Sequence, residues 1–278
     1  MSARRAAVLL MLLVWARVAG AAEICPKGGD PATGPLPGGD GPADFGALPE
    51  VCGATEAALR LRGALLIASS MPDYYGSIIG SATVRGRYQL AEGSSLSVAA
   101  DVFTYRYVNN ANLASQGASA GPATIAFQQA FGLGATTVSA LYARMLLPLD
   151  TARQSGIETG LEVGGGLALY AGARLVVDGG FALAAPIDVA GGQAHLRLDP
   201  IALAEAWLRL RPWVALGAGL NVHVEAAPDF GLTTLVPRLS ARFALRRRFW
   251  MALLVELPVA GSDRTDLIAG LHAGFTPN

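Results

Sequence analysis

The chain has 278 residues, of which 52% are hydrophobic and only 15% are charged. Soluble domains carry about 25% charged residues, so this composition is poor in solubilising groups. The 21 basic residues balance 21 acidic ones, which excludes the basic excess of a nucleic-acid-binding protein. The 34 glycines and 16 prolines argue against a helical membrane bundle.

The first 22 residues have the three parts of a secretory signal peptide. Arg4 and Arg5 supply the positive charge, 6–16 is the apolar stretch, and 19–22 offers small residues for cleavage. A membrane-spanning helix needs about 20 apolar residues, and Arg17 interrupts this stretch too early. We therefore expect Sec-dependent export.

Residues 23–57 form a lead rich in proline and glycine, which cannot bury a core of its own. It contains both cysteines of the chain, Cys25 and Cys52. In an oxidising compartment two such cysteines are expected to form a disulfide. The lead is predicted to be a periplasmic segment or a small plug that this bridge closes.

From Leu59 onward, apolar residues alternate with small or polar ones, most clearly over 214–225 and 235–246. This period of two gives a β-strand one apolar and one polar face. Many of the segments are longer than the stretch of about 9 to 11 residues with which a tilted strand crosses a bilayer. Twelve strands are predicted, near 58–68, 78–91, 94–107, 122–133, 135–148, 156–170, 172–185, 193–210, 212–226, 234–246, 248–258 and 265–276.

Charged residues within a predicted strand share one phase of the alternation. Arg85 and Arg87 share a phase. Arg238, Arg242 and Arg246 likewise share a phase, opposite to that of the apolar residues of their strand. A charge facing lipid costs about 2 to 4 kcal/mol at the bilayer midplane, whereas a charge in a barrel lumen is tolerated. A closed barrel with its polar face inward explains the shared phase.

The predicted connections alternate between short links and longer loops such as 69–77 and 108–121. Outer-membrane barrels combine short periplasmic turns with longer extracellular loops. The predicted fold is an all-β, antiparallel transmembrane β-barrel of about 12 strands over 58–278. A secreted β-sandwich would need a wetted polar face rich in lysine, and the single lysine, Lys27, precedes the strands.

The chain resembles bacterial outer-membrane β-barrel proteins, and in particular the channel barrels associated with phenol-degradation pathways. The resemblance covers about 58–276 and includes the steps Leu147-Pro148, Leu257-Pro258 and Ala185-Pro186 at strand ends. It implies insertion by the barrel assembly machinery into outer-membrane lipid. Many such barrels end in an aromatic residue that this machinery reads, whereas here Phe275, on the apolar phase, is followed by three more residues.

The inward phase defines the candidates for a pore lining. One interpretation is a structural network of ion pairs across the barrel, which the near balance of charge favours. The other is an arginine track that selects anions or carboxylated solutes. The lumen candidates are Arg85, Arg87, Arg144, Arg197, Arg209, Arg238, Arg242, Arg246, Glu162, Asp178, Glu205 and Glu225.

Three functions follow from this interpretation. The leading hypothesis is a narrow passive channel for a small, unidentified solute, because twelve strands lie between small filled barrels and wide porins. The first alternative is a non-conducting structural or surface-interaction barrel. The second is a lipid-modifying enzyme, although His195, His223 and His272 all take the lumen phase. We expect no catalytic residues, cofactor or metal site.

Overall fold

The computed structural model describes residues 51, 55–68, 75–110, 113–147, 157–190, 193–224, 226, 233–245, 249–260 and 267–275. The signal peptide, Cys25, Cys52, Glu225 and Arg246 therefore lie outside the described residues. Every regular element within the described part of the chain is a β-strand. That part of the chain contains no helix with the length and hydropathy needed to span a membrane.

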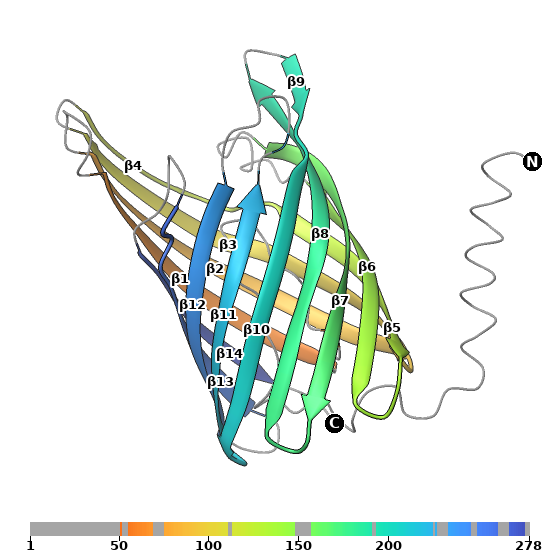
Figure 1. Ribbon diagram of the computed structural model, residues 1–278. Coiled ribbons are helices and arrows are strands. Elements are labelled where there is room, and N and C mark those ends of the chain that lie inside the picture. Colours follow the sequence, from red (N-terminus) through yellow and green to blue (C-terminus); the bar gives the residue numbers. More distant parts are fainter. Residues whose placement is uncertain are drawn as a thin grey trace, which may run out of the picture.

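Strand segments pair with their neighbours into one sheet that closes on itself (Figure 1). All pairings are antiparallel, and the ring closes where β1 pairs with β14. The segments are β1 (Glu56–Ala68), β2 (Tyr75–Ala91), β3 (Ser94–Asn110), β4 (Leu113–Ser119), β5 (Ala123–Gly132), β6 (Thr137–Leu147), β7 (Ile157–Ala171), β8 (Leu175–Ala190), β9 (Gln193–Leu196), β10 (Asp199–Arg211), β11 (Val214–Val224), β12 (Thr233–Ala244), β13 (Phe249–Glu256) and β14 (Leu267–Phe275).

Two of the strands are each built from two segments. β4 and β5 lie end to end along β3, and β9 and β10 lie end to end along β8. The structure is thus a closed, antiparallel barrel of 12 strands, which confirms the predicted fold class. Two details differ from expectation: β4 occupies part of the expected loop 108–121, and the expected strand 193–210 is divided between β9 and β10.

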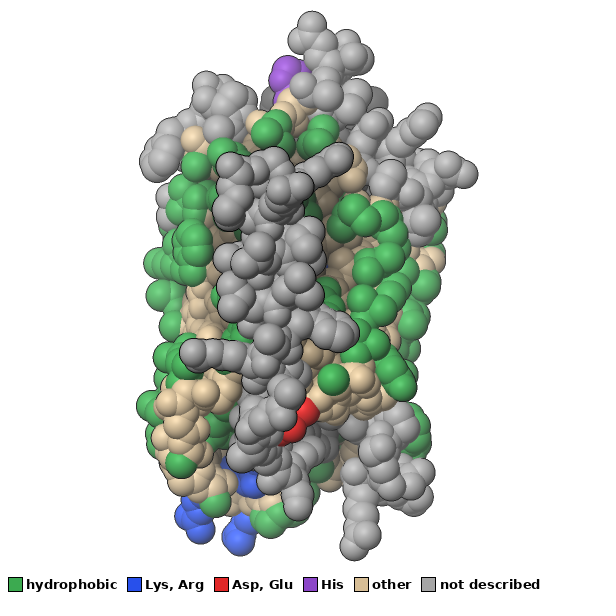
Figure 2. All heavy atoms as spheres, turned by 90° about the vertical axis from the view of Figure 1, so that its right-hand side faces the viewer, with side chains coloured by type: hydrophobic (Ala, Val, Ile, Leu, Met, Phe, Trp, Pro, Cys, Tyr) green, Lys and Arg blue, Asp and Glu red, His purple; other side chains and the backbone are tan. Residues whose placement is uncertain are grey.

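The two faces of the wall are chemically distinct. On β10 buried Asp199, Glu205 and Trp207 alternate with residues exposed on the outside, such as Leu208, which is 46% exposed. Large apolar side chains are exposed on nearly every strand, and hydrophobic atoms spread over the outer flank in Figure 2. Exposure of this extent is rare in soluble monomers and is what lipid contact requires.

Short turns join the strands at one end of the barrel, which is the periplasmic end in outer-membrane barrels. Two of these turns contain a glycine with positive φ, Gly93 at 73° and Gly172 at 68°, a conformation that other residues adopt only at a cost. Arg174 lies in one such turn and is exposed.

Candidate functional site: the barrel lumen

The inner face of the wall is densely charged. Of the predicted lumen residues, seven are buried, namely Arg87, Arg144, Glu162, Asp178, Glu205, Arg238 and Arg242. Arg85, Arg197 and Arg209 are half-buried. Because these side chains alternate with lipid-facing residues, their burial means that they point into the barrel.

One group of charges centres on Arg238 of β12. Its Nε lies 3.4 Å from Glu205 Oε1 and 3.9 Å from Glu256 Oε1. Glu256 is the cross-strand partner of Arg238, but Glu205 is two strands away, with Gly219 of β11 between them. A Cβ at Gly219 would lie 3.0 Å from Glu205 Cγ, so the missing side chain leaves room for the carboxylate to reach the arginine.

A second group lies on β6 and β7. Tyr142 donates a hydrogen bond of 2.6 Å to Glu162 Oε1, and Arg144 Nη1 lies 3.2 Å from the same oxygen. The guanidinium of Arg144 also stands 5.5 Å from the centroid of the Tyr142 ring. This carboxylate is fully buried, and its two partners supply the charge and the hydrogen bonds that a buried carboxylate requires.

A chain of hydrogen bonds connects three strands on the other side of the lumen. Arg60 Nη2 donates to Thr83 Oγ1 at 3.1 Å, and the Thr83 hydroxyl donates to Asp101 Oδ1 at 2.6 Å. The three residues stand in register on β1, β2 and β3. Thr83 therefore links a lumenal cation to a lumenal anion through one hydroxyl group.

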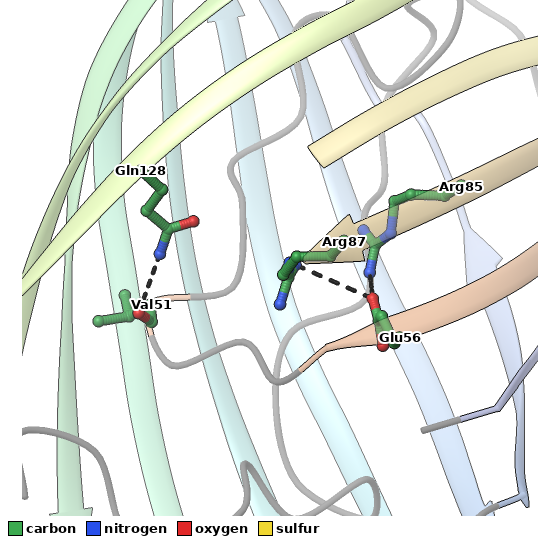
Figure 3. A network of polar contacts seen from close by, with 5 residues as sticks. All are labelled: Val51, Glu56, Arg85, Arg87 and Gln128. Atoms are coloured by element: carbon green, nitrogen blue, oxygen red, sulfur yellow. Dashed lines mark hydrogen bonds and ion pairs between the residues drawn. The ribbon is translucent and has the colours of Figure 1, made fainter. Parts of the chain in front are cut away.

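Glu56 falls within the lead 23–57 defined above and is a further functional candidate. It is the first residue of β1, and its buried carboxylate forms ion pairs with Arg85 and Arg87 (Figure 3). The signal that identifies it is its parity, because Glu56 is in phase with Arg60 and Arg62. The strand simply begins earlier than expected.

Val51 lies inside the barrel, away from the wall strand that follows it (Figure 3). It is 5% exposed and packs against Ala130, Val138, Ala140 and Ala168 of β5, β6 and β7. Gln128 Nε2 donates a hydrogen bond of 2.9 Å to its carbonyl oxygen. Val51 therefore occupies part of the lumen and narrows it at this level.

Two lumenal tryptophans lie flat against glycines of a neighbouring strand. Trp207 covers Gly217, and Trp250 covers Gly274, where an added Cβ would overlap the indole ring. Both indoles belong to a buried apolar cluster with Val176, Ala215, Ala252 and Leu254. The lumen thus combines charged groups with an aromatic and aliphatic surface.

The histidines and carboxylates of the described residues form no group of three or more that could hold a metal ion. His272 is buried on the inner face of β14, and His223 Nε2 lies 3.5 Å from Asp199 Oδ2. His272 and His223 therefore belong to the polar side chains that line the lumen.

Comparisons with known proteins support the barrel. No protein-family model and no curated protein matches the chain. The COG4313 outer membrane channel from Pseudomonas putida F1 is 14% identical and superposes with a TM-score of 0.58, over 84% of this chain and 98% of its own. The translocator domain of autotransporter NalP from Neisseria meningitidis is 12% identical, with a TM-score of 0.53 over 81% of this chain and 89% of its own.

The NanC porin is 8% identical to the chain, with a TM-score of 0.53 over 79% of this chain and 100% of its own. Identities this low show a shared fold. The chain therefore has the fold of outer-membrane barrels, a group that includes channels and a translocator domain, and the expected resemblance is confirmed at the level of the fold.

Proposed function

We propose that the chain is exported by its signal peptide, inserted into the outer membrane by the barrel assembly machinery, and acts there as a narrow passive channel for a small solute. The observation that carries the proposal is the inner face, where charged side chains from most strands point into a closed barrel. A barrel that only anchored a domain would gain nothing from charges in its interior, because each buried charge carries a desolvation cost.

A non-conducting barrel is the second candidate, and one specific observation favours it. The lumenal charges that form ion pairs are largely buried, as with Glu162 at 0% and Arg238 at 2% exposure, and Val51 occupies part of the lumen. Such a barrel would present its loops for interaction at the cell surface. Protease treatment of whole cells should then cut within 108–121, at the connection between β3 and β4.

The inward position of His272 favours transport over lipid chemistry. His195, which was expected on the lumen phase, is exposed on β9. Acyl chains reach the outer surface of a barrel, whereas His272 is buried on the inner face. Phe275 takes the outward phase beside Phe249, with 5.0 Å between the ring centroids. This aromatic pair at the end of the last strand suits recognition by the assembly machinery.

Planar-bilayer recording of the full chain tests the channel directly. We expect small, discrete conductance steps. Ala126→Trp should lower the step size, because Ala126 is buried on the inner face of β5, whereas Ile125→Trp should leave it unchanged, because Ile125 is 37% exposed on the outer face. Heat-dependent migration on gels verifies that both variants form barrels. Persistent silence of the wild type would reject the channel and favour the non-conducting barrel.

A further inference from the structure

Glu56 stands among arginines at the beginning of β1. Its side chain is 5% exposed, and Arg85 Nη2 pairs with its Oε1. Arg87 Nη2 lies 3.9 Å from the same oxygen, with a side chain that is 3% exposed. β1 and β2 together contain four arginines and a single glutamate. Glu56 is therefore surrounded by more than one arginine.

A third guanidinium completes the surroundings of this carboxylate. The positive charge of Arg242 on β12 adds an electrostatic attraction for the Glu56 carboxylate. Its guanidinium lies 4.2 Å from the centroid of the Trp250 ring, which itself rests on Gly274. The stacked indole fixes the arginine, so that the group is oriented before any solute arrives.

We propose that Arg85, Arg87 and Arg242 form a binding site for carboxylate solutes, and that the Glu56 side chain is its resident intramolecular ligand. The inference rests on the proposed channel function and names its substrate class. Guanidinium groups bind carboxylates with strong, charge-assisted hydrogen bonds. The occupant that the structure shows, the carboxylate of Glu56, is itself the chemistry that the site recognises.

The residues around the site indicate what kind of group the solute carries beside its carboxylate. Trp250 belongs to the apolar cluster with Trp207, Ala252 and Leu254, and Ala58 of β1 packs against that cluster. Ala58 shares the inner face of β1 with Glu56. A solute whose carboxylate replaced that of Glu56 would place its body beside this surface, so an aromatic or aliphatic monocarboxylate fits best.

Exchange of the two carboxylates leaves the negative charge that is paired with the guanidinium groups unchanged. The solute brings one negative charge to the guanidiniums, and the Glu56 carboxylate leaves them for the aqueous end of the barrel. Since the arginines keep a counterion throughout, the large cost of leaving a buried charge uncompensated is avoided. Glu56 is attached to the barrel and therefore competes with the solute at a high effective concentration. This competition makes solute binding weak and reversible, as passage through a channel requires.

Calorimetric titration of the full chain in detergent micelles with benzoate tests the site. Glu56→Gln removes the competing charge and should tighten benzoate binding about tenfold. Adding Arg87→Gln to that variant should abolish the gain. Glu162→Gln is the matched control, since it neutralises another buried lumenal carboxylate, paired with Arg144 on a different strand pair, and should leave benzoate affinity unchanged.

Two ligand controls complete the test. Benzyl alcohol, which lacks the carboxylate, should not respond to Glu56→Gln, and acetate should bind more weakly than benzoate. Equal benzoate affinity in the wild type and Glu56→Gln, with heat-dependent gel migration showing both to be folded, would overturn the site. Because calorimetry does not require conduction, benzoate binding by a silent barrel would reject the channel and keep the site.

Discussion

Strands β12, β13, β14, β1, β2 and β3 form one continuous half of the barrel wall, and β4 to β11 form the other. The first group, here the basic half, contains seven arginines and three carboxylates. The second, the acidic half, contains three arginines and six carboxylates. The strands of a chain that is neutral overall therefore divide into a net basic half and a net acidic half.

The apolar residues of the lumen divide differently. Tyr142, Leu146 and Ile201 belong to a buried cluster that lies on β6, β8 and β10, entirely within the acidic half. The tryptophan cluster reaches from β8 and β10 to β13, and so spans both halves. An anion in the lumen is thus drawn to the basic half, and an apolar group finds contacts beside it.

The largest expected effect comes from the residue that joins the halves. Arg238→Ala removes the cation between Glu205, on the acidic half, and Glu256, on the basic half. Deleting one partner of a buried charge group costs about 3 to 5 kcal/mol, so the free energy of unfolding in lipid vesicles should fall by that amount. Arg174→Ala, in an exposed turn, is the control and should change little; equal effects would contradict the burial argument.

Overpacking within the basic half should have the next largest effect. In Gly274→Ala the new Cβ meets the Trp250 indole, which must move together with the Arg242 stacked on it. A cost of about 1 to 3 kcal/mol is expected from such overpacking, measured by urea unfolding. Gly86→Ala is the control, because Gly86 is exposed with nothing within 4 Å of its added Cβ. A similar loss there would show that glycine in general, not the indole contact, matters.

A hydroxyl from each half permits a direct comparison. Tyr142→Phe deletes a donor to Glu162 in the acidic half, and Thr83→Val deletes the link between Arg60 and Asp101 in the basic half. Hydrogen bonds to charged groups contribute about 1.5 to 3 kcal/mol, and each variant should lose stability in that range. A loss confined to one half would show that only that half is rigidly organised.

The smallest expected effect is on ion selectivity. Arg62→Gln in the basic half should lower the anion preference, and Asp178→Asn in the acidic half should raise it, because each removes one charge from the lumenal wall. Reversal potentials in a potassium chloride gradient should shift in opposite directions by a few millivolts, an order of magnitude set by a modest change in permeability ratio. Shifts of the same sign would mean that ions pass one wall only.

The sidedness of the wall was predictable because lipid imposes it. On β12 the expected alternation holds, with Leu239 61% exposed and Arg238 2% exposed. The alternation of exposed and buried residues breaks down where a strand is irregular. Between Ala82 and Thr83 the pairing of β2 with β3 shifts, so that Val102 and Phe103 are both exposed.

The contacts among lumenal charges could not be predicted from the sequence. Parity places Glu205 and Arg238 on the inner face, but their ion pair depends on the register of three strands and on Gly219 between them. The position of Val51 against β5 to β7 likewise follows from no periodicity in the sequence. Sequence thus determines which residues face inward, and register determines which of them meet.

The pairing of β1 with β14 joins the two ends of the strand series. Glu56 and Arg242 come from β1 and β12, which in the closed wall are separated only by β13 and β14. The cluster of Glu56 and the arginines is therefore complete only after the last strand has been added. Until then Glu56 lacks the electrostatic attraction of Arg242. Closure of the ring therefore stabilises the cluster, and an unclosed assembly intermediate is less stable.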